Sequence, residues 1–251
     1  MQLVFDILSW GAWSVDFQNK ESWSEWDKRA SDSNLTPNAS SISPPLLQVP
    51  AMKRRRFSRL TKMMLTAAYD CNPAENCRSV FASRHGELTR TLGLLKDVVI
   101  KESLSPLAFS QSVHNTASGI YGIVTGNTAP STSIAAGEET LSLAMVEVYA
   151  QLAENPEPVL MVFGDDPVPP IYNQFTLEFE LPLAMGLYLA PANSGHSQTL
   201  AQLTLTNSDN NEAASPQPIS FAELIHAIAS DKAKSGQLCQ WQWQLKSYNG
   251  Q

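Results

Sequence analysis

Two short, largely apolar runs constrain the fold more than any other feature of this sequence. Ser79–Ser83 (SVFAS) and Pro158–Gly164 (PVLMVFG) have the composition of strands that are buried on both faces of a sheet. Between them lie Glu87–Val99, Phe109–Thr125 and Glu138–Leu152, in which apolar residues recur at spacings of three and four. Each of these three segments is therefore predicted to be a helix with one face on the sheet. The alternation predicts an α/β fold with a layered sheet and flanking helices.

Further elements are expected on either side of this centre. Met1–Ile7 is predicted to be a strand, and the apolar spacing of Arg54–Tyr69 predicts an amphipathic helix. Pro182–Ala190 and Leu200–Thr206 are predicted to be two strands that form a hairpin around residues 193–195.

The C-terminal part contains one clear helix signal. Ser220 and Glu223 form a capping box that opens a helix through about Ala229. Residues 19–50 and 207–218 are polar and irregular in pattern, and we expect them to be a surface stretch and a loop. We expect a single domain over residues 1–251, in which residues 191–251 form a C-terminal hairpin and helix.

Charge and cysteine content exclude several classes of function. The chain has 251 residues and a formal charge of -7, from 17 Lys plus Arg and 24 Asp plus Glu, so it is not expected to bind nucleic acid. Its three cysteines are an odd number and form no pair of CxxC elements, so no disulfide framework is expected. Its four histidines are scattered, so no metal site is expected, and we expect no cofactor. We find neither a signal-peptide pattern nor an apolar run long enough to cross a bilayer, and we expect a reducing cytoplasmic location.

A basic run is the strongest local charge feature. Lys53–Arg56 is followed by Arg59 and Lys62. Because Arg55, Arg56, Arg59 and Lys62 recur at helical spacing, they are predicted to form a rim that meets an acidic partner surface. Solvation of the run, or neutralisation of nearby carboxylates, is the alternative.

Three sets of polar residues and a tryptophan cluster are further candidates for functional features. Arg84–Glu87 follows a predicted strand and opens a helix, where Gly86 would permit the turn and Glu87 would favour the helix N-terminus. His114 is expected to be a satisfied core polar group, and Cys71 and Cys77 are expected in a polar loop. Four tryptophans, at positions 10, 13, 23 and 26, indicate core or partner interface.

The segment from Ser105 to Gly164 resembles the N-terminal half of the β-ketoacyl synthases. The residues that carry the resemblance are Ser105-Pro106, Asn115, Ala117-Ser118-Gly119, Gly126, Ala129-Pro130-Ser131-Thr132-Ser133-Ile134 and the strand that ends at Gly164. The register needs no gap, and it places Glu138 where the family has its nucleophilic cysteine. The resemblance implies a truncated thiolase-like fold with a mixed sheet, in which a strand leads through Gly137 into an elbow at the start of a helix.

Motifs elsewhere make the resemblance narrower. They resemble the short β-ketoacyl-synthase-like chain length factors of bacterial aryl polyene and related fatty-acid-like clusters. These motifs are Pro50-Ala51-Met52 with Arg54-Arg55-Arg56, Phe81 to Leu88, Leu104-Ser105-Pro106 with Phe109-Ser110, Ser112 to Asn115, and Ala135 to Thr140. The similarity covers most of residues 1–190, whereas residues 191–251 diverge.

The resemblance implies a non-catalytic subunit. Glu138 stands in place of the cysteine, and the residues after Asp166 offer only His196 and His226, in no ketosynthase setting. A decarboxylative condensation needs a nucleophile and donors for the developing charge. The implied partners are therefore a full-length β-ketoacyl-ACP synthase, in a heterodimer, and the acyl carrier protein through that complex.

The same resemblance implies where the partner and the acyl tunnel would lie. In this fold family the strand before the elbow, here about Ser131–Ala136, commonly pairs with its counterpart across a dimer, and the segment that corresponds to Phe109–Thr125 commonly lies beside the acyl tunnel. The residues so implicated are Ser131, Thr132, Ser133, Ile134 and Glu138 at the strand and elbow, and Leu107, Ala108, Phe109, Val113, His114, Asn115 and Ile120 at the tunnel.

Two other functions remain open at the level of sequence. Glu138 could assist malonyl-ACP decarboxylation or priming, and filling of a vacated elbow is the simpler interpretation. A stand-alone thiolase-fold acyltransferase or hydrolase would need Ser83, Ser118 or Ser133 as its nucleophile, and none lies in GxSxG or beside a plausible base.

Overall fold

The computed structural model describes residues 1–26, 41–176, 182–207 and 217–247. The strands are β1 Gln2–Ser14, β2 Arg78–Ala82, β3 Ser131–Ile134, β4 Val159–Asp165, β5 Leu183–Pro191, β6 Ala201–Thr206, β7 Lys234–Leu238 and β8 Trp241–Ser247. The helices are α1 Lys20–Ser24, α3 Ala51–Arg54, α4 Arg59–Cys71, α5 Leu88–Ile100, α6 Pro106–Ser110, α7 Thr116–Thr125, α8 Thr140–Glu154 and α9 Phe221–Ala229, with 3-10 turns η1 Gly137–Glu139 and η2 Pro170–Phe175.

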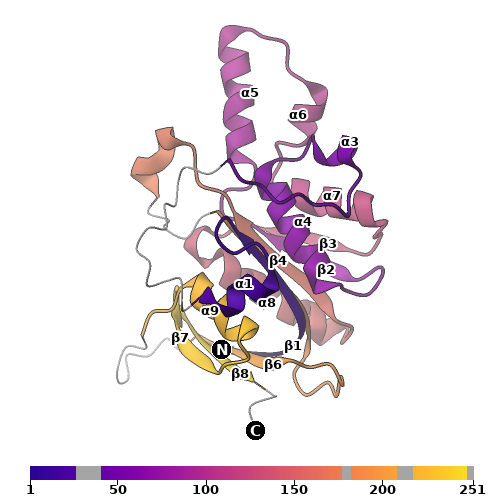
Figure 1. Cartoon of the computed structure of the whole chain (residues 1–251), viewed down its shortest axis with the longest axis vertical. Coiled ribbons are helices and arrows are strands. Elements are labelled where there is room, and N and C mark those ends of the chain that lie inside the picture. The colour runs from indigo at the N-terminus through magenta and orange to yellow at the C-terminus, as the bar shows by residue number, and fades with distance from the viewer. Residues whose placement is uncertain (27–40, 177–181, 208–216, 248–251) are drawn as a thin grey trace.

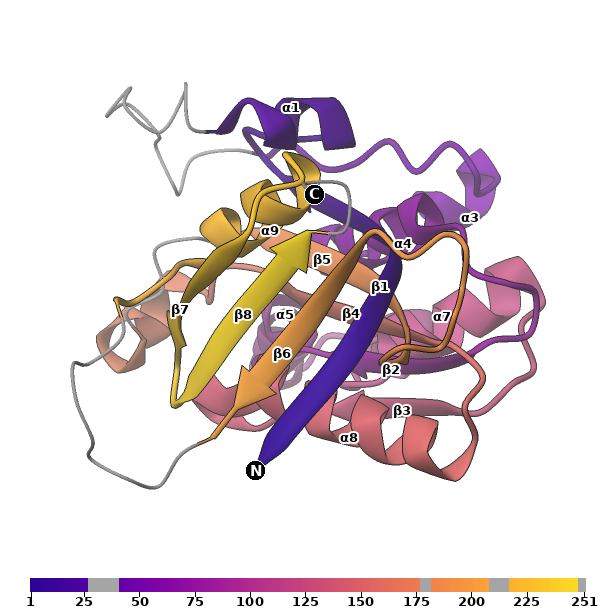
Figure 2. The same cartoon turned by 90° about the horizontal axis from the view of Figure 1, so that it is seen from below.

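All of these strands belong to one mixed sheet, in the order β3-β2-β4-β5-β1-β6-β8-β7 (Figures 1 and 2). The strands β3, β2 and β4 are parallel, and the other pairs are antiparallel. The predicted strands at 79–83 and 158–164 are confirmed as β2 and β4, which lie side by side. On β4, Val159, Met161 and Phe163 face one core, and Leu160 and Val162 face the other, so the strand is buried on both faces.

The predicted hairpin between β5 and β6 is wrong, because β1 lies between them (Figure 2). β1 extends to Ser14, well beyond the predicted end at Ile7, and pairs with β5 along one side and with β6 along the other. Gly11 permits its close approach to α4, since a Cβ at this position would lie 2.5 Å from the carbonyl oxygen of Ala67. A hairpin does form further along the chain, where β7 and β8 pair and continue the same sheet.

Each face of the sheet is covered by its own helices. α8 and α9 pack on one face, with the core residues of β1, β6 and β8, and α4 and α7 pack on the other. The helix predicted to begin at Ser220 is confirmed, with both hydrogen bonds of its capping box. Trp10, Trp13 and Trp23 are buried and belong to the core, whereas Trp26 is half-buried and packs against the ring of His226.

Helix α5 departs from the prediction, because it does not pack on the sheet. Together with α6 it projects from the end of the molecule (Figure 1), and we call residues 88–110 the α5–α6 arm. Leu94 is the only buried residue of α5, whereas Val99 is 79% exposed, and Phe109 of α6 is 62% exposed. The predicted helix 109–125 is interrupted at residues 111–115, so that α6 belongs to the arm and only α7 packs on the body.

The two edges of the sheet differ. The outer edge of β7 is covered by residues 217–219, since Gln237 exchanges backbone hydrogen bonds with Gln217 and Ile219 at 2.8 Å each. At the other edge, β3 pairs only with β2, and its second side has no strand partner among the residues that the structure describes.

Two polar stretches were expected to be irregular. The first, 19–50, contains α1, which is capped by Asn19, and its residues 27–40 lie outside the described part of the chain. The second is the loop expected at 207–218, most of which also lies outside. Among the described helices, none is both long and apolar enough to cross a membrane.

Candidate functional site

The parallel strands β2, β3 and β4 have their carboxyl ends at the same end of the sheet. The chain forms the predicted elbow there, directly after β3. β3 runs into Gly137, whose φ of +57° turns the backbone sharply, and the single turn η1 leads into α8. The hydroxyl of Thr140 accepts a hydrogen bond from the Ala136 amide at 2.9 Å and donates one to the Gly137 carbonyl at 2.7 Å. The elbow is thus held by its own residues.

Glu138 occupies the tip of this elbow and is exposed to solvent. Its carbonyl oxygen accepts a hydrogen bond from the thiol of Cys239 at 3.0 Å, and the carboxylate of its neighbour Glu139 accepts one from the Gln240 amide at 3.1 Å. The turn between β7 and β8 therefore rests directly on the elbow. This contact was not foreseen, because β7 and β8 were not predicted.

None of the three cysteines, all within the described residues, stands at the start of α8. Burial raises the pKa of the Cys239 thiol, and the nearby Glu139 carboxylate raises it further, so this thiol is a poor nucleophile at neutral pH. Cys71 does not lie in a loop as expected, and Cys77 lies in the loop between α4 and β2 but is buried. Cys71 ends α4, both are buried in the core beneath α4 and α7, and burial raises the pKa of each.

A buried carboxylate, Asp165, organises the turn that follows β2. Its Oδ1 accepts hydrogen bonds from the Ser83 hydroxyl at 2.7 Å and from the amides of Arg84 and His85 at 2.9 and 3.2 Å. The Gly86 amide donates to the Ser83 hydroxyl at 2.9 Å, and Gly86 has the positive φ expected of it. Burial raises the pKa of Asp165 to about 6, against the lowering effect of these hydrogen bonds.

The sequence analysis did not predict the Asp165 cluster, although an aspartate at the end of an apolar strand could have indicated a buried polar site.

His114, expected in the core, is an exposed residue whose Nε2 lies 2.8 Å from the Ser83 carbonyl oxygen. Ser83 itself is buried and engaged with Asp165, and the hydroxyls of Ser118 and Ser133 are bonded to each other at 3.1 Å. Among the described residues, none of these three hydroxyls is hydrogen-bonded to a histidine that could act as a base.

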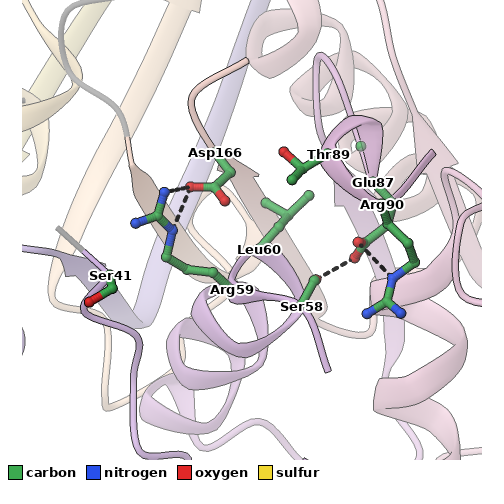
Figure 3. A pocket seen from close by; sticks show the side chains of 9 residues that line it. Ser41, Ser58, Arg59, Leu60, Glu87, Thr89, Arg90 and Asp166 are labelled. Atoms are coloured by element: carbon green, nitrogen blue, oxygen red, sulfur yellow. Dashed lines mark hydrogen bonds and ion pairs between the residues drawn. The ribbon is translucent and has the colours of Figure 1, made fainter. Parts of the chain in front are cut away.

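A pocket of about 560 Å³ lies beside this cluster, between the N-termini of α4 and α5 (Figure 3). On one side Arg59 forms a two-pronged ion pair with Asp166, at 2.8 and 2.7 Å. On the other, Glu87 accepts a hydrogen bond from Ser58 at 2.6 Å and lies 3.5 Å from the Arg90 guanidinium. Each arginine in the pocket is balanced by a carboxylate, so the pocket has little net charge.

The predicted basic rim is only partly formed. Ser58 caps α4, so Arg55 and Arg56 precede the helix and do not share a helical face with Arg59 and Lys62. Arg59 points into the pocket and pairs with Asp166, instead of facing solvent. What remains exposed is Lys53, Arg55 and Arg56, which we call the basic surface.

The residues implicated in partner contact lie in three environments. Leu107, Phe109, Val113, His114 and Asn115 are exposed on the arm and in the connection to α7, and Ala108 is half-buried. Ile120 is instead buried in the core with α4. Ser131 is exposed and Thr132, Ser133 and Ile134 are half-buried along β3.

Residues 23–244 match the profile of the β-ketoacyl synthase N-terminal domain family. The chain belongs to this family. Comparison with curated proteins finds none that matches the sequence significantly. The predicted fold, a mixed sheet with flanking helices as in the N-terminal half of a ketosynthase, is confirmed.

Solved structures share this fold at low sequence identity. The structure titled "Ketosynthase (ApeO) in Complex with its Chain Length Factor (ApeC) from Xenorhabdus doucetiae" matches with a TM-score of 0.74 and 24% identity, over 97% of this chain and 99% of that chain. The ishigamide ketosynthase/chain length factor matches with a TM-score of 0.66 and 12% identity, over 91% and 81%. AntDE:AntF, a type II polyketide acyl-carrier protein in complex with its ketosynthase, matches with a TM-score of 0.60 and 10% identity, over 92% and 82%.

Proposed function

We propose that this chain is a non-catalytic subunit, similar to a chain length factor, that pairs with a full-length β-ketoacyl-ACP synthase in the cytoplasm. The observation that carries the proposal is the elbow, whose tip carries the carboxylate of Glu138, while the Cys239 thiol beside it belongs to the β7–β8 turn and is bonded to the Glu138 carbonyl oxygen. A carboxylate at this position cannot accept an acyl group as a thiolate does. The partner would supply the cysteine and the histidines, and the chain would need no cofactor or metal.

Two surfaces support a large partner on the elbow side of the molecule. The α5–α6 arm exposes apolar residues that no described element covers, among them Val98, Val99, Ile100 and Phe109. The open edge of β3 ends at Ile134, shortly before Glu138 in the chain. Contiguous exposed apolar surface and an unpaired strand edge are both features that a partner chain would cover.

In this proposal the arm and the connection to α7 shape the end of the acyl tunnel. Leu107, Phe109 and Val113 carry the exposed apolar side chains nearest to Asn115 in the chain. They would limit the length of the growing chain by filling space, in aryl polyene or polyunsaturated fatty-acid-like elongation. Overfilling an apolar cavity costs roughly 1–3 kcal/mol, which is enough to change the preferred product.

Co-expression with the full-length ketosynthase of the same organism tests the proposal. We expect a 1:1 complex by native mass spectrometry, condensation activity only when both chains are present, and none from this chain alone. Glu138→Ala is expected to leave complex formation and product yield unchanged, whereas a loss of malonyl decarboxylation would assign Glu138 the chemical role. A self-sufficient homodimer that turns over an acyl thioester would contradict the proposal.

The basic surface gives the complex a contact for an acidic acyl carrier protein. Lys53, Arg55 and Arg56 are exposed, and none forms an ion pair with another described residue, in a chain whose formal charge is -7. The double change Arg55→Glu with Arg56→Glu is expected to weaken carrier-protein binding to the complex roughly five- to tenfold and to reduce its salt dependence. Titration by fluorescence anisotropy at two salt concentrations measures both effects.

The control for this experiment is Lys232→Glu with Lys246→Glu. It changes the net charge by the same amount at exposed positions in the C-terminal part of the chain. Equal weakening by both pairs would show that only the net charge matters, and would remove the basic surface from the proposal.

A further inference from the structure

The α5–α6 arm joins the body through two segments that contact each other. Residues 83–87 lead into α5, and residues 111–115, which we call the return segment, lead from α6 to α7. Of the described arm residues, Leu94 alone is buried in α5 and none is buried in α6, so packing against the body does little to direct the arm. Its direction therefore depends on the hydrogen bonds of the two joining segments.

The entry to the arm is fixed to the centre of the sheet. Asp165, at the end of β4, accepts hydrogen bonds on Oδ1 from the Ser83 hydroxyl and from the two backbone amides that follow it. Ser83 is 3% exposed, its amide donates to the Ile134 carbonyl oxygen at 3.1 Å, and its hydroxyl accepts a hydrogen bond from the Gly86 amide. Three donors on one oxygen bind the ionised carboxylate strongly. Residues 83–86 are therefore a rigid support for the segment that rests on them.

The return segment rests on this support through His114. The Nε2 atom of His114 lies 2.8 Å from the Ser83 carbonyl oxygen. Because a carbonyl oxygen only accepts hydrogen bonds, Nε2 carries a proton and donates it, in the neutral ring as in the charged one. Gly86 makes room for the ring, since a Cβ at this position would lie 3.1 Å from His114 Cδ2, and its φ of +52° suits glycine. His114 thus ties the exit of the arm to its entry.

A second hydrogen bond between the arm and the return segment is weaker. The Thr91 hydroxyl lies 3.2 Å from the Ser112 carbonyl oxygen and 3.1 Å from the carbonyl oxygen four residues before Thr91. A hydroxyl has a single hydrogen, so these two acceptors share it. Beyond the return segment, Thr116 begins α7 and is buried in the body. Of the two described hydrogen bonds, that of His114 is the shorter and is not shared, and it fixes the angle at which the return segment leaves α7.

We propose that His114 is a positioning residue for the wall of the acyl tunnel, and that the Asp165 cluster supports it. His114 acts through the backbone of the return segment and not by touching the growing chain. The inference rests on the proposed function, in which Leu107, Phe109 and Val113 form the end of the tunnel. A wall that is fixed at one place stops the growing chain at one length, whereas a wall that yields admits longer chains as well.

Three substitutions separate the donor of His114 from the bulk of its side chain. His114→Gln places an amide nitrogen near the position of Nε2 and so retains a donor. His114→Asn is one carbon shorter and places its nitrogen near the position of Nδ1, out of reach of the Ser83 carbonyl oxygen. His114→Phe retains a ring of similar size without a donor. Because His114 is exposed, all three variants are expected to fold as the unmodified chain does.

The product-length distribution of the complex with the ketosynthase tests the proposal, measured by mass spectrometry of the released acyl chains at equal turnover. In His114→Asn and His114→Phe, the ratio of the main product to products one two-carbon unit longer is expected to fall roughly fivefold, the effect of one hydrogen bond on an equilibrium. In His114→Gln the ratio is expected to stay within about twofold of the unmodified complex. A product length that follows side-chain size across the three variants would show that His114 lines the tunnel directly, and would overturn the positioning role.

Two controls separate this result from stability and from the proposed function. Arg78→Met removes hydrogen bonds at the opposite end of β2 and is expected to leave the ratio unchanged, so a fivefold shift there would assign the effect to lost stability and overturn the proposal. Val113→Phe adds bulk to the tunnel wall itself and is expected to shorten the product. A shorter product from Val113→Phe, with an unchanged ratio in His114→Asn and His114→Phe, would leave the proposed function standing and reject the role of His114.

Hydrogen–deuterium exchange of the isolated chain tests the contact of His114 without a partner. Peptides that span residues 106–116 are expected to exchange roughly fivefold faster in His114→Asn and His114→Phe than in the unmodified chain and in His114→Gln. Equal exchange in all four chains would overturn the positioning role. Faster exchange in the two variants, in a chain that binds no ketosynthase, would support the contact and reject the proposed function instead.

Discussion

The proposed complex with a ketosynthase is expected to lose roughly 100-fold or more in affinity when Val99→Asp and Phe109→Asp are introduced together into the α5–α6 arm. These side chains are 79% and 62% exposed in the isolated chain, so the substitutions remove no internal packing and the chain should fold as before. In the complex each aspartate would be a buried, unpaired charge, which is costly to desolvate. Isothermal titration calorimetry of the two purified proteins measures the loss.

Leu47→Asp provides the control for the arm variant. Leu47 is 72% exposed and lies outside the arm, so its substitution places a charge on an equally accessible apolar site. We expect its effect on affinity to stay within about threefold, which corresponds to less than 1 kcal/mol. If the arm variant binds as tightly as the unmodified chain, the ketosynthase does not use the arm.

Replacing Arg78 by Met is expected to lower the free energy of unfolding by roughly 3 kcal/mol. The Arg78 guanidinium, at the start of β2, donates hydrogen bonds to the carbonyl oxygens of Gln151, Asn155 and Glu157 at 2.7, 2.7 and 2.6 Å. These carbonyls lie at and beyond the C-terminus of α8, where a cation also interacts favourably with the helix dipole. The substitution therefore removes the guanidinium from all three acceptors at the end of α8, of which the Gln151 carbonyl keeps a hydrogen bond from the Asn155 amide.

Urea denaturation followed by circular dichroism measures this change. Arg78→Lys keeps the charge but not the planar fork of donors, and it should lie between the unmodified chain and Arg78→Met. Arg55→Met removes an exposed arginine and should change the free energy of unfolding by less than about 0.5 kcal/mol. A loss of similar size in Arg55→Met would show that the effect is one of net charge and not of the α8 terminus.

The sequence predicted an element correctly where the pattern of its own residues, such as an apolar run or a helix cap, matches its surroundings in the fold. The apolar runs of β2 and β4 are buried on both faces, and the Ser220–Glu223 capping box marks the start of α9, so these elements could be predicted from their own residues. The amphipathic pattern of α5 was interpreted as a face on the sheet, but the same pattern suits a face kept for another chain. Periodicity identifies an apolar face and does not say which molecule covers it.

Long-range pairing was the main part of the fold that the sequence did not reveal. β5 and β6 are close in the chain, and nothing in either strand shows that residues 2–14 insert between them. At the site, the elbow at Gly137 and Glu138 was expected from the family resemblance, whereas the hydrogen bonds of Asp165 and the turn at Cys239 depend on segments that are far apart in sequence. Such contacts are set by the assembled sheet, which local propensity does not encode.

The unequal edges of the sheet limit how far this chain can associate through strands. A subunit with two free edges can add copies at both ends, and its assembly continues as a fibril. Here residues 217–219 already pair with β7 at Gln237, so that, among the described strands, the β3 side is the one whose edge is open along its length. Association through the sheet is therefore expected at the β3 side, where a second copy of this chain would compete with the proposed ketosynthase partner.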